Sequence, residues 1–368
     1  MKFGGYDNIL IADILLLLVF GLIVISSASV VVSYENYDSN FYMLYSQIVK
    51  GVLPGLVCAA VLSRIDYHIY KKYAPLFLLA TMALLLSVFV PGIGDAAKGA
   101  SRWIELAGIR FQPSELAKLT FLLYLAAWLE KRKNRIGDIQ EGVIPFLFLV
   151  ALVALPVMKQ PDLGTLLIIG SIALVMYFMA GAPLKHMAAI IICGATTVMF
   201  YIQIEPYRKN RFDIFLNPDM DQQGTGYQIN QALLAIGSGG VFGLGLGHSR
   251  QKFNYLPEAA NDSIFAIIGE ELGLVGVIFL LSLYLIFAMR GLGIVERTRD
   301  DFGKLLATGV TFWITFQAIL NIGAITSLVP LTGIPLPFVS SGGSAVMSLL
   351  MGIGVLLSVS KFGSTYKK

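Results

Sequence analysis

Apolar stretches recur along the whole chain, and they restrict its fold more than any other feature of the sequence. They run to about twenty residues, long enough for a helix to cross a hydrocarbon layer about 30 Å thick. Backbone polar groups in lipid must be satisfied within the segment itself, so these stretches predict an all-α, polytopic helical bundle in a membrane. The composition agrees, because only 14% of the residues are charged, against about 25% in an ordinary soluble domain.

Ten membrane-spanning helices are expected along the chain. They cover residues 9–32, 42–62, 74–92, 114–130, 142–158, 162–181, 185–205, 262–289, 303–329 and 338–360. If the N-terminus is cytoplasmic, sixteen of the 27 Lys and Arg residues lie on the inner side, nine lie on the outer side and two lie within spans. The positive-inside rule favours this orientation, which places both termini in the cytoplasm. We interpret residues 1–368 as a single membrane domain with one large outer loop at 206–261.

The nine outer cations concentrate in two loops, at 93–113 and 206–261. A basic outer face is typical of a surface that binds an anionic, membrane-borne ligand. The remaining cations lie mainly in short loops, where membrane orientation accounts for them, so nothing predicts a nucleic-acid surface. Cys58 and Cys193 lie inside apolar runs without a CxxC or His partner, and we expect neither a disulfide nor a metal site from them.

Charged residues in or beside the spans are costly in lipid and are therefore the first candidates for a functional site. Glu115 and Lys118 stand at i and i+3 after a Pro-Ser helix-start signal, where they can neutralise one another. Arg102, in the preceding loop, either holds a phosphate or anchors the loop at the interface. Lys50 lies about 12 Å into its span, where it is either functional or extends its amine to the membrane surface.

Two outer connections carry polar residues between apolar runs. In the turn KQPDLGT, Asp162 is expected either to cap the following helix or to pair with Lys159. The connection before the tenth span has three prolines and paired glycines at membrane depth, which predicts broken helices whose backbone lines a cavity or is covered by protein. The hydroxyls of Ser340, Ser341 and Ser344 either receive a pyrophosphate or belong to a structural re-entrant turn.

Asp262 opens the eighth span, where it is either a helix N-cap or a proton acceptor. A helix N-terminus favours the ionised carboxylate, which can act as a base. Glu270 and Glu271 lie about 12 Å further along that helix, so they cannot form a glycosidase-type pair with Asp262. We expect them to bond neighbouring helices instead. The glycines at 237–247 lack the GK[ST] ending of a P-loop and are weak evidence for a phosphate site.

Seven strings on this framework of spans together resemble the SEDS family, the FtsW, RodA and SpoVE proteins of bacterial cell-wall synthesis. In order, the strings are PSELAK, QPDLGT, FLNPDMD, GYQINQALLAIGSGG, YLPE, IGEELG and TGIPLPFVSSGG. The resemblance covers nearly the entire chain, and IGEELG and PLPFVSSGG lean towards the FtsW and SpoVE branch. Two departures surround the matching aspartate: Ala260 and Asn261 replace the usual His-Thr, and Ser263 replaces an aromatic residue.

This resemblance implies a peptidoglycan glycosyltransferase that polymerises lipid II at the outer face of the cytoplasmic membrane, with Asp262 as the general base. The implied partners are lipid II, a class B penicillin-binding protein and membrane lipids, and a divalent cation, Mg or Mn, is a plausible cofactor although the sequence shows no metal cage. The candidate substrate contacts are Lys50, Arg102, Glu115, Lys118, Lys159, Asp162, Arg211, Glu258, Ser340 and Ser341.

Two alternatives to the enzyme stay open on sequence grounds. A lipid II flippase is one, because buried charges and broken helices also describe carriers. A non-catalytic scaffold that recruits a transpeptidase is the other. Most charged candidates cluster at the outer end and not near the membrane midplane, which favours the enzyme over the carrier.

Overall fold

The computed structural model describes residues 5–91, 94–97, 100–106, 109–204, 206–217, 221 and 224–363. A helix corresponds to each of the ten expected spans, so the all-α membrane fold is confirmed. The helices are α1 (Asn8–Ala28), α3 to α4 (Tyr42–Arg64, with a π-helical turn at Ile48–Val52), α5 (Tyr67–Ser87), α6 (Pro113–Lys131), a π-turn with α7 (Ile139–Lys159), α8 (Leu163–Met179), α9 (Leu184–Ile204), α12 (Ile264–Arg297), α13 (Asp301–Ile325) and α14 (Gly343–Phe362).

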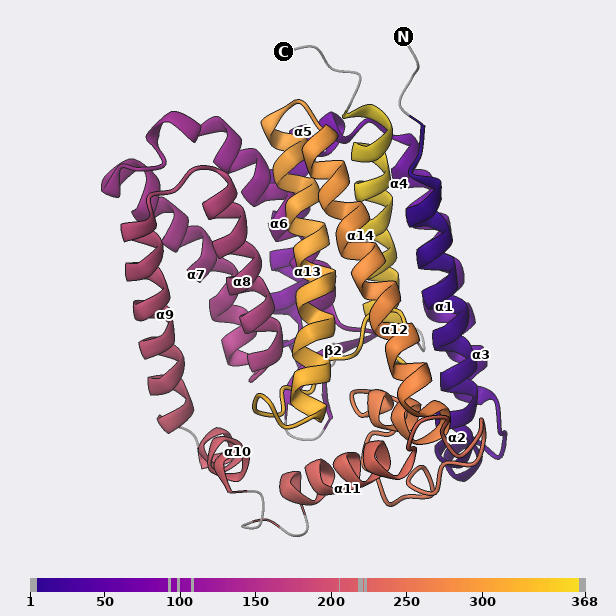
Figure 1. Ribbon diagram of the computed structural model, residues 1–368. Helices are drawn as coiled ribbons and strands as arrows, with labels where there is room; N and C mark the ends of the chain where they lie inside the picture. Colours follow the sequence, from indigo (N-terminus) through magenta and orange to yellow (C-terminus); the bar gives the residue numbers. More distant parts are fainter. Residues whose placement is uncertain are drawn as a thin grey trace.

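Eight of these ten segments are long and apolar enough to cross a membrane by themselves. The other two differ for simple reasons: α8 has 17 residues, and α6 carries charged residues at both of its ends. The beginning of α1 and the end of α14 lie at the same end of the bundle (Figure 1), as an even number of crossings requires.

The centre of the bundle is formed by α13 and α14, whose most apolar windows are each 72% buried. α14 packs against α4 along a seam of small residues. A β-carbon on Gly354 would lie 2.8 Å from the Cα of Ala59, so only glycine permits this approach. By contrast, the corresponding window of α9 is only 6% buried, and this helix stands at one edge of the bundle (Figure 1).

The outer connection at 93–113, expected as a loop, contains a small antiparallel sheet. Its strands are β1 (Gly94–Ala97), β2 (Ala100–Leu106) and β3 (Ile109–Phe111), in the order β1-β2-β3. Ile104 of β2 pairs with both Gly94 and Phe111, and its side chain is buried. Pairing within the connection satisfies backbone groups that a bare loop would leave unpaired.

The large outer loop at 206–261 contains two helices and a glycine-rich turn. α10 (Pro206–Leu216) and α11 (Thr225–Ser238) lie across the end of the bundle opposite the start of α1, and the shorter α2 (Val30–Tyr37) lies at the same end (Figure 1). The glycine-rich turn follows α11 and contacts α12.

That turn is inserted into a break in α12, at Gly273, whose φ is +64°. The amides of Leu244 and Gly245 donate to the carbonyls of Glu270 and Glu271. Beyond the break, the amides of residues 274 and 275 donate to the carbonyls of residues 240 and 241. The glycines therefore allow close contact with a helix.

Candidate functional site

The non-helical connection between α13 and α14, residues 326–342, is the platform of the candidate site; we name it the Pro-rich segment. It is irregular and largely covered by protein, as predicted, with Leu336, Phe338 and Val339 at most 2% exposed. Side chains of three helices satisfy its backbone carbonyls: Asn321 bonds Ile334 (2.7 Å), Gln317 bonds Pro335 (2.9 Å), Tyr284 bonds Pro337 (2.6 Å) and Gln47 bonds Ser340 (3.2 Å). These bonds replace the missing helical ladder and fix the segment in place.

The loop that carries Asp262 is docked on this platform. Ser340 Oγ donates to the carbonyl of Asn261 at 2.6 Å, and Ser341 Oγ donates to the Asn261 side-chain oxygen at 2.6 Å. The carbonyl of Asp262 itself accepts a bond from Asn321 Nδ2 at 2.8 Å. The backbone on both sides of the carboxylate is therefore held by the Pro-rich segment and α13.

The Asp262 side chain is half-buried and faces the backbone at Gly333. A β-carbon built on Gly333, whose φ is +67°, would lie 3.8 Å from Asp262 Oδ2. The N-cap of α12 is Ser263, and the helix begins at Ile264. The interpretation of Asp262 as an N-cap is therefore wrong, because it lies one residue too early, and its carboxylate is directed at the platform.

At the start of α6, Glu115 and Lys118 form a buried ion pair with a Nζ–Oε1 distance of 2.9 Å. Their predicted mutual neutralisation is confirmed. Lys118 is 0% exposed, donates to Gln317 Oε1 at 3.2 Å and lies over the ring of Trp313. Because Gln317 also holds the Pro335 carbonyl, the pair supports the platform from inside the bundle and does not present its charge at the surface.

Asp162 caps α8, which is one of its two predicted roles. Its carboxylate accepts the Thr165 amide at 3.0 Å and the Thr165 hydroxyl at 2.8 Å. The alternative ion pair with Lys159 is wrong: within the described chain no salt bridge joins them, since Lys159 is exposed at the end of α7 while the buried carboxylate is directed at the α8 amides. The adjacent Gly164 lies against Ile334 of the platform, leaving no room for a β-carbon.

Three of the predicted cations differ in exposure and in the bonds that their charged groups make. Arg102 of β2 donates to the carbonyls of Gln160 (2.8 Å) and Pro161, so it anchors its strand to the turn before α8. Arg211 of α10 donates to the Leu331 carbonyl at 3.3 Å. Lys50 is exposed on the π-turn after α3, and its backbone contacts the first residue of α14. Of these cations, Lys50 has the most accessible charge.

The structure thus brings most of the predicted residues together around the Pro-rich segment. Ser340 and Ser341 belong to it, and Glu258 lies on the docked loop, exposed and bonded to Asn261. Lys159 has no described contact with the segment.

Sequence reasoning missed the uncharged amides that hold the platform, namely Gln47, Gln317 and Asn321. All three are at most 4% exposed. The available signal was a carboxamide inside an otherwise apolar span, because an amide at that depth needs both donor and acceptor partners.

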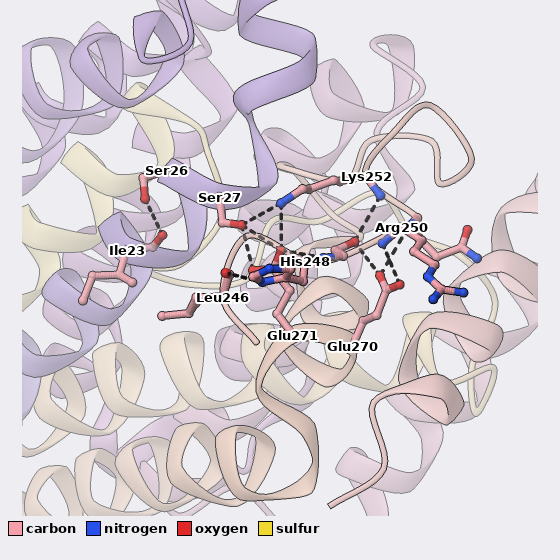
Figure 2. A network of polar contacts seen from close by, with 11 residues as sticks. Ile23, Ser26, Ser27, Leu246, His248, Arg250, Lys252, Glu270 and Glu271 are labelled. Carbon is pink, nitrogen blue, oxygen red and sulfur yellow. Dashed lines mark hydrogen bonds and ion pairs between the residues drawn. The ribbon is translucent and has the colours of Figure 1, made fainter. Parts of the chain in front are cut away.

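Glu270 and Glu271 occupy a separate buried network, shown in Figure 2. Glu271 accepts bonds from Ser27 Oγ of α1 (2.7 Å), Lys252 Nζ (3.0 Å) and the Ser249 amide (3.1 Å). Glu270 accepts from the Ser249 hydroxyl and the Arg250 amide. The expectation that Glu271 bonds a neighbouring helix is confirmed. Glu270 instead bonds residues 249 and 250, which follow the glycine-rich turn.

The donor set does not form a metal cage. Among the residues that the structure describes, no group of three or more His, Cys, Asp or Glu side chains is arranged to hold a metal ion. A divalent cation at this site stays a prediction.

Together, the fold and the site define a polytopic helical membrane protein in which a loop carboxylate rests on a re-entrant platform at one end of the bundle. The family model for the FtsW, RodA and SpoVE proteins, described as "Cell cycle protein", matches residues 7–365. The chain belongs to this family, as its sequence strings indicated, and is a multi-pass protein of the bacterial cytoplasmic membrane.

Relatives and solved structures agree with this assignment. A probable peptidoglycan glycosyltransferase FtsW of Geobacter metallireducens is 39% identical over 96% of this chain and 94% of its own length. Stage V sporulation protein E of Bacillus subtilis is 38% identical over 97% of both chains.

Among solved structures, a chain of a peptidoglycan synthase complex that coordinates polymerization and crosslinking matches with a TM-score of 0.82. It is 28% identical, with 98% of this chain and 99% of that chain covered. The rod shape determining protein RodA of Thermus thermophilus matches with a TM-score of 0.72 and 28% identity, over 99% of this chain and 98% of that chain.

Proposed function

We propose that this protein is a peptidoglycan glycosyltransferase that polymerises lipid II at the outer face of the cytoplasmic membrane, with Asp262 as its general base. One observation carries the assignment: the loop of Asp262 is fixed through its backbone on the Pro-rich segment, while the residue is only partly buried. A base must be held in position and yet be reachable by substrate. The names of the FtsW relatives, probable peptidoglycan glycosyltransferases, support the same reaction class.

In the proposed reaction, the 4-hydroxyl of the acceptor N-acetylglucosamine attacks the anomeric carbon of the donor strand. The new glycosidic bond forms as the bond from that carbon to the pyrophosphate oxygen breaks, with inversion at the carbon. The hydroxyl proton passes to the Asp262 carboxylate, and undecaprenyl pyrophosphate leaves as an anion. A sugar hydroxyl is a poor nucleophile at neutral pH, so a positioned carboxylate helps as the proton becomes acidic in the transition state.

The leaving pyrophosphate needs positive charge more than it needs a proton. Lys50 is exposed beside the N-terminus of α14, where the helix dipole also favours an anion. Ser344 in the first turn of α14 is buried, and its hydroxyl has no hydrogen bond in the described structure, whereas the hydroxyls of Ser340 and Ser341 donate to Asn261. We assign the pyrophosphate to Lys50 and this helix end.

The test is polymerisation of purified lipid II, followed on a gel, by the full chain together with a class B penicillin-binding protein. Asp262→Asn keeps the shape of the side chain and removes the base, so glycan polymer is expected to disappear while the thermal unfolding midpoint stays unchanged. Asp38→Asn is the matched control, since Asp38 is exposed with φ +51°, a conformation that Asn accepts. Polymer from the Asp262 variant at the wild-type rate would reject the assigned base.

The same experiment separates the two alternatives. A flippase would carry lipid II across the vesicle membrane without joining it into glycan polymer. A scaffold would support crosslinking by its partner even with Asp262→Asn. We propose a transpeptidase as the partner because the matching solved chain belongs to a complex that couples polymerization to crosslinking.

A further inference from the structure

At the end of the bundle opposite the Asp262 site, a groove lies between α1, α4 and α14. It encloses about 270 Å³ and its lining is mainly aliphatic, with Ile14, Leu15, Leu56 and Leu350 among the wall residues. Leu15 is 47% exposed, so the groove opens on the face of the bundle that a membrane would cover. An apolar slot of this kind accommodates an acyl chain.

The cytoplasmic end of the groove is polar and basic. Tyr6 and Arg64 both line it, and Lys361 Nζ lies 3.3 Å from the Tyr6 hydroxyl and 4.9 Å from the centre of its ring. In the described part of the chain no carboxylate forms an ion pair with Arg64 or Lys361. The nearest acidic residues along the chain are already engaged: Asp7 by Arg290 and Asp66 by His68.

The pKa of the Tyr6 hydroxyl agrees with this surplus of positive charge. Burial by itself would raise the pKa of this hydroxyl, but hydrogen bonds with Ser63 and Lys361 and the charges of Lys361 and Arg64 outweigh it, and the pKa is lowered from 10.0. Lys361 thus contacts the Tyr6 hydroxyl, and Arg64 lines the same end of the aliphatic slot.

We propose that this groove is a binding site for an anionic glycerophospholipid of the inner leaflet, with its phosphate between Arg64 and Lys361 and one acyl chain along α1, α4 and α14. The occupant follows from charge complementarity at the mouth and from the apolar walls below it. A zwitterionic lipid would match the walls but not the mouth. The site is independent of the proposed glycosyl transfer, which takes place at the other end of the bundle.

The test uses native mass spectrometry of the full chain in detergent with equal amounts of dioleoyl-phosphatidylglycerol and dioleoyl-phosphatidylcholine. Each cation near a lipid phosphate gives about a fivefold preference, so the wild type is expected to retain phosphatidylglycerol on the order of twentyfold better. Arg64→Gln with Lys361→Gln should abolish that preference, and Arg64→Lys with Lys361→Arg should keep it. The charge-matched control is Lys131→Gln with Lys185→Gln, two exposed cations outside the groove lining.

A second pair of variants tests the slot and not the charges. Ala60→Phe fills the groove and should lower retention of both lipids, whereas Val57→Phe, on a 63% exposed position of the same helix outside the lining, should not. Equal retention of the two lipids by the wild type would overturn the proposal. The proposal would also be overturned if a photo-crosslinker at position 60 captured a protein helix, and no phospholipid, in cell membranes.

Discussion

At the scale of single residues, the two kinds of carboxylate in this protein differ in what surrounds them. Asp262 is half-buried, and the loop that carries it is held through its backbone. Glu271 is 1% exposed and its oxygens are bonded by Ser27, Lys252 and Ser249. A carboxylate whose oxygens accept bonds from three internal donors stabilises the structure and cannot serve as a base.

We therefore expect Glu271→Gln to lower the yield of folded protein. The substitution leaves the buried ammonium of Lys252 without its counter-charge, and breaking a buried pair in this way costs about 3 kcal/mol or more. Monodisperse yield after detergent extraction and the thermal unfolding midpoint measure the effect. Adding Lys252→Met should recover part of the loss, because the uncompensated charge is then gone.

Glu35→Gln, at an exposed glutamate, is the control and should change neither quantity. A Glu271→Gln protein that folds with normal yield but forms no glycan would show that the residue acts in the reaction and contradict the structural role.

At the scale of elements, the break in α12 depends on the glycine-rich turn inserted into it. Gly243 has φ +78°, and a β-carbon there would come within 2.1 Å of the Glu271 carbonyl oxygen. Gly273 has φ +64° and would bring its β-carbon within 2.3 Å of the Gly243 amide. Both positions combine a left-handed conformation with backbone contact, so neither can accept a side chain without moving the turn.

We expect Gly243→Ala to displace the turn and to lower the thermal unfolding midpoint sharply. Gly247→Ala separates the two causes, since Gly247 has φ +83° but open space around it, and should cost only about 1 kcal/mol of backbone strain. Gly237→Ala, within α11 and equally open, should be neutral or slightly stabilising. Equal midpoints for the 243 and 247 variants would show that strain alone matters.

At the scale of the whole molecule, the beginning of the chain is fastened to the distant helix α12. Arg290 Nε donates to Asp7 Oδ1 at 3.1 Å and its terminal nitrogen donates to Oδ2, while the same carboxylate caps α1 through the Leu10 amide. Burial raises the pKa of Asp7, but the bonds from Arg290 and Leu10 outweigh it, and the pKa is lowered from 3.8.

Because this pKa is lower in the folded protein than in the unfolded chain, the contact stabilises the fold at pH values above about 3.8, and that contribution is lost as the pH falls through the folded value. Asp7→Asn keeps the cap and removes the charge, so it should lower the unfolding midpoint at neutral pH by an amount corresponding to about 2 kcal/mol. The gap between variant and wild type should close on acidification. A gap that is constant down to about pH 3 would contradict the assignment.

Sequence alone determined the class of fold, the ten spans and the family, because long apolar runs and ordered strings are local properties of a chain in lipid. It also located Asp262, the Glu115–Lys118 pair and the irregular connection before α14. It left Asp262 and Asp162 each with two roles, because capping depends on where a helix begins to within one residue.

Only the tertiary structure decided which residues meet. Gln47, Gln317 and Asn321 come from different parts of the sequence, yet they bond one Pro-rich segment and so position the loop of Asp262. The role of the glycines after α11 depends on the break in α12, into which their turn is inserted. The physical reason is that a buried amide, or a close approach of two backbones, depends on its partner in space. Local hydrophobicity indicates neither the identity of that partner nor its distance.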